Sequence, residues 1–356
     1  MPGGTDRHRE LSWKGMLSRG ITTAQALSAH FRIDVDALQE VIARYPMRIN
    51  PYYLSLIRRK GDAIYRQCVP DVREITDEKG MEDPLNEEEL SPIPGLTQRY
   101  PDRVLFLISS HCPVYCRFCN RKRKVGQSSM VTEESIREGL LYIRTHREIR
   151  DVILSGGDPL LLGNRKLSLI LSELRSMPHV EIIRIGTRVP CTLPQRITPQ
   201  LARMLKKFHP LYIHTHFNHP SEITAEASLA CARLADAGIP LGCQTVLLKG
   251  VNDDPVVMKR LMQKLLTIRV RPYYLFQADL ARGTSHFWTP IGKGLEQIEN
   301  LQGHTSGLCV PHFAIDLPGG GGKVPLLPEY VREGEGGMLL VKNYQGAQYC
   351  YPLDNA

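Results

Sequence analysis

The chain has 356 residues, of which 42% are hydrophobic and 23% charged, the usage of an ordinary globular protein with room for one large domain and an accessory segment. Its net charge of +8 suits anionic partners in general, but net charge identifies neither a fold nor a particular ligand. Residues 1–10 are polar and lack the apolar stretch of a secretory signal, and no run of eighteen apolar residues occurs. We therefore expect a cytoplasmic protein with neither a membrane nor a nucleic-acid partner.

Cysteine usage also bears on the compartment. The nine cysteines are an odd number and are scattered along the chain, except for one group of three. A disulfide framework would require an even, closely spaced set in a much shorter chain. The pattern favours a reducing compartment and cysteines that act as ligands.

The first part of the chain is helical in pattern. Helices are predicted over residues 24–31 and 35–45, with Thr22, Thr23 and Asp34 as candidate caps, and prolines interrupt the pattern after them. Residues 76–101 are acidic and contain prolines, so we interpret them as an extended connection with a boundary near Leu96. We define residues 1–95 as an N-terminal helical segment and connection.

Short apolar runs then alternate with helical patterns, which predicts a parallel sheet with right-handed crossovers. Six units in about 175 residues are too few for a complete eight-stranded barrel. The expected fold is therefore α/β, a partial six-unit (β/α)6 barrel over residues 96–290, with its active site at the C-terminal ends of the strands. Residues 291–356 form a C-terminal segment that is glycine-rich and then strand-like. The six predicted strands cover residues 104–109, 152–155, 180–186, 211–216, 241–248 and 270–276.

Three cysteines directly follow the first predicted strand with the spacing C-x3-C-x2-C: Cys112, Cys116 and Cys119. Three thiolates can hold a four-iron cluster and leave one iron open for a substrate. A zinc site stays open as an alternative, with His111 or a distant cysteine as the fourth ligand. Three buried structural cysteines are disfavoured because basic residues surround them.

The spacing, with the aromatic Phe118 before the last cysteine, resembles the radical S-adenosylmethionine superfamily. The resemblance implies that the open iron of a 4Fe-4S cluster binds S-adenosyl-L-methionine and that electron transfer generates an adenosyl radical. Ser155, Gly156, Gly157 and Asp158 follow the second predicted strand and are similar to the superfamily's glycine motif, which contacts S-adenosylmethionine. Taken alone, a Gly-Gly pair after a strand would be an ordinary turn.

A run of four glycines precedes Lys323 near the end of the chain. A phosphate-binding loop of the Walker type is excluded, because Val324 and Pro325 follow the lysine where Ser or Thr and a helix are required. A flexible linker with a solvated lysine is one interpretation. The other is a close-packed pocket in which the lysine binds pyridoxal 5'-phosphate.

Together these motifs resemble the lysine 2,3-aminomutase family, from about Ser12 to Tyr351. The resemblance rests also on residues 100–104, 215–220, 268–274 and 303–307. It implies that Lys323 is the catalytic lysine that holds pyridoxal 5'-phosphate and that Arg103 lies near the cofactor phosphate.

The same resemblance implies the substrate contacts. Arg121 corresponds to the arginine that binds the substrate carboxylate, and a guanidinium suits that task by bidentate hydrogen bonding. Asp279 and Asp316 correspond to two aspartates that bind the distal ammonium of lysine, because two carboxylates in one pocket repel each other unless a cation lies between them. His216 and Gln244 resemble S-adenosylmethionine-contacting positions, although buried structural polar residues also occur at strand ends.

The sequence departs from the family in one respect that concerns zinc. Family members carry a cysteine-rich C-terminal tail and a further cysteine after the fifth strand, whereas here residues 250–254 lack a cysteine and only Cys350 lies near the end. We therefore expect no structural zinc, and a homo-oligomer stays open. Around the cluster motif, Phe118, Asn120 and Lys122 replace the commoner His, Thr and Arg.

The activity implied is that of an isomerase that moves the alpha-amino group of L-lysine to the beta carbon, with a reducing electron donor as partner. Arginine or glutamate as substrate, or a lysine destined for a translation factor, are the alternatives; the two aspartates disfavour glutamate but do not separate lysine from arginine. From other classes, a radical enzyme acting on RNA and a structural zinc-binding protein stay open.

Overall fold

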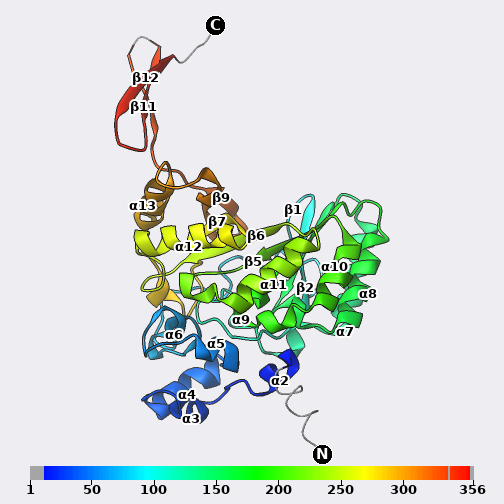
Figure 1. The fold of residues 1–356 in the computed structure, drawn as a ribbon. Helices are drawn as coiled ribbons and strands as arrows, with labels where there is room; N and C mark the ends of the chain where they lie inside the picture. The colour runs from blue at the N-terminus through cyan, green and yellow to red at the C-terminus, as the bar shows by residue number, and fades with distance from the viewer. Residues whose placement is uncertain (1–11, 336, 353–356) are drawn as a thin grey trace, which may run out of the picture.

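A computed structural model of the chain describes residues 12–335 and 337–352, so the prediction for residues 1–10 lies outside the described part (Figure 1). In the described ranges, no helix has the length and apolar character needed to cross a membrane.

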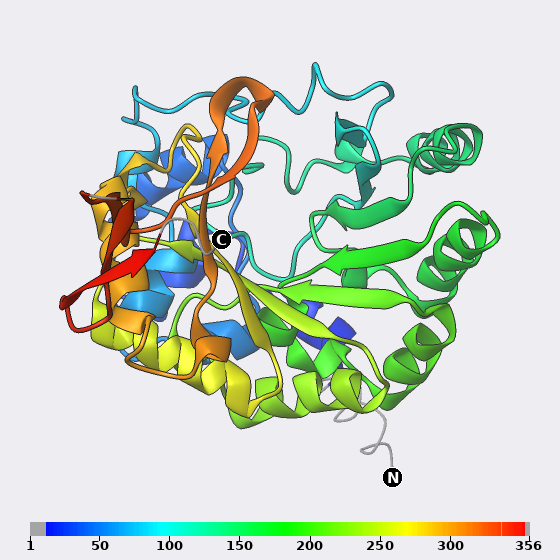
Figure 2. The same cartoon turned by 90° about the horizontal axis from the view of Figure 1, so that it is seen from above.

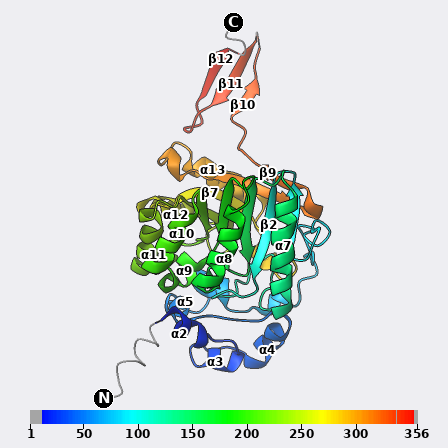
Figure 3. The same cartoon turned by 90° about the vertical axis from the view of Figure 1, so that its right-hand side faces the viewer.

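Five short helices lie beneath the main sheet, as Figures 1 and 3 show: α2 (Trp13–Ser18), α3 (Ala24–Ser28), α4 (Val35–Arg44), α5 (Pro51–Ser55) and α6 (Ala63–Cys68). Each begins at a side chain that accepts a hydrogen bond from the first turn; Thr23 and Asp34 cap α3 and α4 as predicted. Pro51 opens α5, where the missing N–H costs nothing. The two predicted helices are confirmed, with slightly earlier ends.

The core of the molecule is a curved nine-stranded sheet in the order β1 to β9. All six predicted parallel strands are confirmed: β2 (Arg103–Ser109), β3 (Asp151–Gly156), β4 (Ile182–Gly186), β5 (Leu211–Thr215), β6 (Leu241–Leu247) and β7 (Arg271–Gln277). Figure 2 shows the sheet curving into a partial barrel, as expected from the sequence. Parallel pairing carries the C-terminal ends of these strands to one rim, where the predicted site residues follow them.

Three further strands extend the sheet. β1 (Leu96–Tyr100) pairs antiparallel with β2, β8 (His312–Leu317) pairs parallel with β7, and β9 (Gly322–Pro325) returns antiparallel along β8. The glycine run with Lys323 is therefore part of a β-hairpin inside the main sheet. The division at residue 290 stays a prediction, while the sheet itself continues across it.

Helices cover the outer face of the sheet (Figure 2): α7 (Glu133–Thr145), α8 (Asn164–Arg175), α9 (Val189–Thr192), α10 (Pro199–Leu205), α11 (Ala225–Asp236), α12 (Pro255–Thr267) and α13 (Ile291–Leu301). The buried residues of α8 are Leu167, Ile170, Leu171 and Leu174, an i, i+3, i+4, i+7 pattern. On α7, a Cβ at Gly139 would lie 2.2 Å from the ring of Phe106 on β2. Only glycine allows that helix to pack so closely on the sheet.

A separate three-stranded antiparallel sheet projects from the main body near the C-terminus (Figures 1 and 3). It consists of β10 (Val331–Glu333), β11 (Met338–Lys342) and β12 (Gln348–Pro352), which confirms the strand-like interpretation of this region. Every described residue of β10 and β12 is exposed.

Candidate functional site

The three-cysteine group occupies the loop that follows β2. Cys112, Cys116 and Cys119 are partly exposed, whereas the cysteines elsewhere in the sheet and helices are buried; none of the described cysteines forms a disulfide. Burial of the sulfur raises the pKa of Cys112, and raises that of Cys119 to about 11, so both are neutral thiols until a metal binds. In the described residues no three His, Cys, Asp or Glu side chains stand close enough to share one metal ion. A 4Fe-4S cluster does not require this, because each thiolate binds a different iron.

Arg188 is a neighbour of the cluster loop that sequence reasoning missed. Its Nη1 lies 2.8 Å from Sγ of Cys116, and its Nη2 donates to Glu222 and Gln67. A buried guanidinium beside a thiolate ligand offsets part of the negative charge of an iron-sulfur cluster. The available signal was its position directly after β4, at the rim where loops of a barrel carry function.

Buried ion pairs anchor the cluster loop on the N-terminal side. Glu74 is fully buried; its Oε1 accepts from Nε of Arg117 at 2.9 Å, and its Oε2 lies 2.8 Å from Nζ of Lys122. Lys122 also donates to the carbonyl of Gly283, in the loop after β7. Burial opposes ionisation of Glu74, but the two cations outweigh it and lower its pKa.

The glycine motif brings the end of β3 against the cluster loop. A Cβ at Gly156 would lie 2.2 Å from the carbonyl oxygen of Ser109, and one at Gly157 would lie 2.5 Å from that of His111. Both glycines are therefore required by the close approach. The Asp158 carboxylate accepts from Oγ1 of Thr187 at 2.7 Å and belongs to a buried side chain whose pKa burial raises to about 6. It fixes the loop after β4, and its predicted contact with S-adenosylmethionine stays a prediction.

His216 lies just beyond the end of β5, whereas Gln244 lies in the middle of the neighbouring strand β6. His216 follows β5; its Nε2 is 2.9 Å from Oδ1 of Asn218, and its ring centroid is 5.5 Å from that of Phe118. Burial lowers the pKa of His216 to about 3, so the imidazole is neutral. Gln244 lies on β6 in register with Tyr274 of β7.

The hairpin of β8 and β9 places Lys323 directly opposite Asp316. Nζ of Lys323 lies 3.0 Å from Oδ2 of Asp316 and 5.3 Å from the ring centroid of Phe276. The backbone N–H of Lys323 donates to Oη of Tyr100, and the guanidinium of Arg103 stacks 4.4 Å from the centroid of the same ring. The fold thus brings the predicted cofactor lysine and the predicted phosphate arginine into contact with the same residue, Tyr100.

Two arginines lie in this corner. Nε of Arg99 is buried and donates no hydrogen bond within the described residues, whereas Nε of Arg103 lies 3.3 Å from Oδ1 of Asp102 in an ion pair. A buried guanidinium N–H without an acceptor costs free energy unless an anion satisfies it. A primary amine, an aromatic ring and two arginines fit an aldehyde cofactor that carries a phosphate, so these residues suit pyridoxal 5'-phosphate.

The two aspartates differ in their partners. Asp316 is paired with Lys323 and, at 3.1 Å, with Nη1 of Arg99. Asp279, after β7, accepts from Nδ2 of Asn120 at 2.8 Å, and no ion pair reaches it within residues 12–335 and 337–352. Burial, with a smaller contribution from the charge of Asp316, raises the pKa of Asp279 to about 6. Asp279 is therefore the carboxylate of this corner that still needs a cation.

Arg121 follows the last cluster cysteine and is largely buried against Glu87. Sequence reasoning did not assign this partner. Nε of Arg121 is 2.8 Å and 3.0 Å from the two carboxylate oxygens, and its Nη2 is 2.5 Å from Oε1. Its Nη1 points toward Oγ of Ser155, 3.4 Å away. The signal for Glu87 was its place in the acidic segment before β1.

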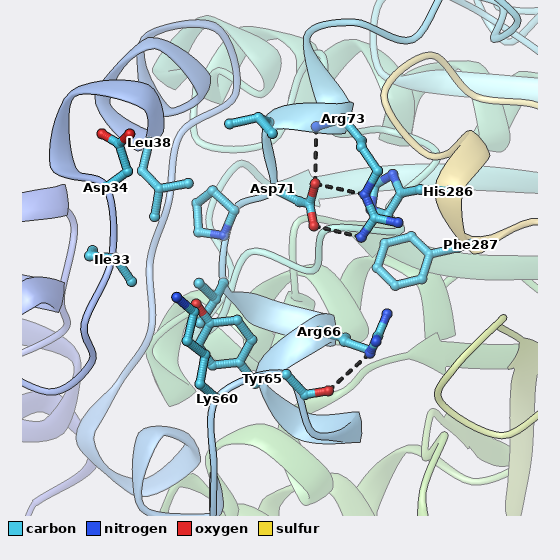
Figure 4. A pocket seen from close by; sticks show the side chains of 14 residues that line it. Ile33, Asp34, Leu38, Lys60, Tyr65, Arg66, Asp71, Arg73, His286 and Phe287 are labelled. Carbon is cyan, nitrogen blue, oxygen red and sulfur yellow. Dashed lines mark hydrogen bonds and ion pairs between the residues drawn. The ribbon is translucent and has the colours of Figure 1, made fainter.

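A cleft of about 300 Å³ lies elsewhere, between the N-terminal helices and the loop after β7 (Figure 4). Tyr65, Arg66 and His286 are among its lining residues, and Asp71 pairs with Arg73 at its edge. None of the predicted site residues lines it, and its Lys60 and Arg66 side chains donate to backbone carbonyls. We do not assign the function to this cleft.

The chain is similar to known proteins along nearly its whole length. Residues 106–261 match the family Radical SAM superfamily, and residues 298–355 match the family Lysine-2,3-aminomutase. A protein named L-lysine 2,3-aminomutase from Methanococcus maripaludis is 51% identical, over 96% of this chain and 82% of the relative. One of the same name from Clostridium subterminale is 49% identical over 95% and 83%, and a glutamate 2,3-aminomutase from Clostridioides difficile is 44% identical over 94% and 81%. The chain therefore belongs to the lysine 2,3-aminomutase family within the radical S-adenosylmethionine superfamily.

Proposed function

We propose that the protein is an isomerase that moves the alpha-amino group of L-lysine to the beta carbon and so forms L-beta-lysine. The observation that carries this proposal is Asp279, a partly buried carboxylate that none of the described residues pairs with as a cation and that lies beside a second carboxylate, Asp316. A bound substrate with a distal ammonium supplies the missing positive charge. The names of the relatives from Methanococcus maripaludis and Clostridium subterminale agree with this substrate.

When bound, the 4Fe-4S cluster and S-adenosyl-L-methionine supply a carbon radical, and pyridoxal 5'-phosphate delocalises the unpaired electron. Cys112, Cys116 and Cys119 would hold the cluster, and Ser155 to Asp158 with His216 and Gln244 would contact S-adenosylmethionine. Lys323 and Arg103 would hold pyridoxal 5'-phosphate.

The chain's own contribution is to hold the amino acid at both ends. Arg121 binds the alpha-carboxylate, and Asp279 with Asp316 binds the distal ammonium. Fixing both ends leaves only the alpha and beta carbons to react and excludes other hydrogen atoms from abstraction.

The test is anaerobic incubation of the iron-loaded protein with S-adenosylmethionine, a reductant, pyridoxal 5'-phosphate and one amino acid at a time. Beta-amino products are separated by chromatography and identified by mass. We expect conversion of lysine that requires all components. Turnover of glutamate without turnover of lysine would refute the role given to Asp279 and Asp316.

Arginine is the second candidate substrate, because its guanidinium is also a distal cation. Glutamate, the substrate in the name of the Clostridioides difficile relative, would bring a third negative charge to this corner. The same assay separates the three amino acids. A lysine destined for a translation factor is tested by adding the product of that assay to an acceptor protein.

Partners and organisation complete the proposal. The enzyme acts in the cytoplasm with a one-electron donor and without nucleic acid or membrane, and its units are residues 1–95, 96–290 and 291–356. We propose a homo-oligomer because Val331, Tyr349 and Tyr351 expose apolar surface on the projecting sheet, which is too small to be stable alone. Light scattering of the purified protein measures its mass, and a monomer would contradict this.

A further inference from the structure

Residues 83–91, which we call the strap, contact both the β8–β9 turn and the basic residues that follow Cys119. The strap's carbonyl oxygens of Pro84 and Leu85 accept from N–H of Gly319 and Nη2 of Arg99, at 3.1 Å and 2.9 Å. The strap thus touches the glycine loop and the counter-ion of Asp316. Its acidic side chains face the basic run that follows the last cluster cysteine.

Four ion pairs join the strap to that basic run, and they differ in burial. Arg123 pairs with Asp83 at 2.9 Å and with Glu88 at 3.2 Å. Glu88, whose side chain is 62% exposed, also pairs with Lys124 at 2.9 Å. Glu87 is only 7% exposed and pairs with Arg121, which is 14% exposed. Glu87 is therefore the acid of the strap that is buried with the predicted carboxylate-binding arginine.

The pairing uses one defined edge of the guanidinium. Nε and Nη2 of Arg121 both donate to the Glu87 carboxylate, which is the side-on edge of the fork. Nη1 is turned toward β3, with only a long contact to Oγ of Ser155. An arginine presents five donors, so the end-on edge remains for a second carboxylate.

We propose that Glu87 is a positioning residue for the substrate: it holds the side-on edge of Arg121 so that the end-on edge faces the alpha-carboxylate of the amino acid. This inference rests on the proposed function and names the residue that orients its carboxylate contact. Without Glu87 the long side chain of Arg121 would sample other rotamers, and binding would have to restore the lost order.

The test compares Glu87→Gln with Glu88→Gln in the holoenzyme under anaerobic turnover. Both variants make the same chemical change in neighbouring positions, but only Glu87 contacts Arg121. For Glu87→Gln we expect the KM for lysine to rise by about 10-fold or more, with kcat within about 3-fold. Glu88→Gln is expected to stay within about 2-fold in both constants. Glu87→Asp, which keeps the charge, should fall between wild type and Glu87→Gln.

A second probe separates positioning from general damage. 1,5-Diaminopentane carries both amino groups of lysine but no carboxylate, so its inhibition constant should change by less than about 2-fold in Glu87→Gln. Equal weakening of lysine and 1,5-diaminopentane would overturn the proposal in favour of a structural role. A lower KM in Glu87→Gln would also overturn it, because Glu87 would then compete with the substrate. Failure of the proposed function is distinct: the wild-type protein itself would form no beta-amino product, and the inference on Glu87 would fall with it.

Discussion

Charged side chains are paired differently in the cluster loop and in the substrate corner, the group formed by Asn120, Asp279, Asp316 and Lys323. In the cluster loop, buried Arg117 and Lys122 both pair with one buried carboxylate, Glu74. In the substrate corner, Asp279 is left with an amide and a neighbouring carboxylate. Paired charges form a structural frame, whereas a charge kept without a counter-ion costs stability and marks where a charged ligand binds.

Lys323→Ala gives the largest expected effect and acts on the substrate corner alone. It removes the amine that holds the cofactor, so turnover should fall by at least about 10³-fold in the anaerobic product assay. Cluster absorbance should be unchanged, because Lys323 lies in the β8–β9 hairpin and not in the cluster loop. A variant that kept substantial activity would contradict the assignment of pyridoxal 5'-phosphate to Lys323.

Glu74→Gln removes the carboxylate that pairs with Arg117 and Lys122 in the cluster loop. It leaves two buried cations without their counter-ion, and we expect a loss of about 3–5 kcal/mol in the free energy of unfolding. Urea denaturation followed by circular dichroism measures it. The matched control is Glu88→Gln, whose exposed ion pairs should contribute less than about 1 kcal/mol. Equal losses for the two variants would remove the distinction between the regions.

Asp279→Asn should separate stability from binding. Since burial raises the pKa of the Asp279 carboxyl to about 6, the ionised form is costly in the substrate-free protein, and the neutral amide should raise its melting temperature. The KM for lysine should rise by about 10-fold or more because the ammonium loses its unpaired partner. A lower melting temperature together with an unchanged KM would show that Asp279 belongs to the frame.

The pH dependence of lysine binding gives the smallest expected effect. As pH falls through about 6, Asp279 becomes protonated in the substrate-free enzyme and no longer attracts the ammonium, so KM should rise on the acidic side. Above pH 6 the carboxylate is ionised and KM should be level. In Asp279→Asn this acidic rise should be absent, and the same rise in both proteins would point to another group.

The sequence predicted the frame of the sheet better than its edges. The six parallel strands are confirmed because each is a compact apolar run, as in β3 and β4. β1, β8 and β9 were missed. Leu96–Tyr100 is half polar, Gly322–Pro325 is only four residues with a glycine and a proline, and His312–Leu317 has polar residues at its first and fifth positions. β1 and β9 are specified by pairing with a neighbouring strand and not by local pattern.

Some site residues could be predicted from the sequence and others could not. The cysteines and Lys323 lie in short motifs that are visible in a single sequence. Glu87, Arg188 and Asn120 have no motif, because their partners lie 34, 72 and 159 residues away along the chain. The fold alone brings such pairs together, so their functions could be inferred only from the structure.

The register of the β8–β9 hairpin limits how this protein can change over evolution or by engineering. Lys323 faces Asp316 because the two are cross-strand partners, and neighbouring residues of a strand point to opposite faces. Inserting or deleting a single glycine in the turn would reverse the face on which the lysine emerges. Substitutions in the hairpin leave this register unchanged, whereas a change in the length of the turn alters it in a single step.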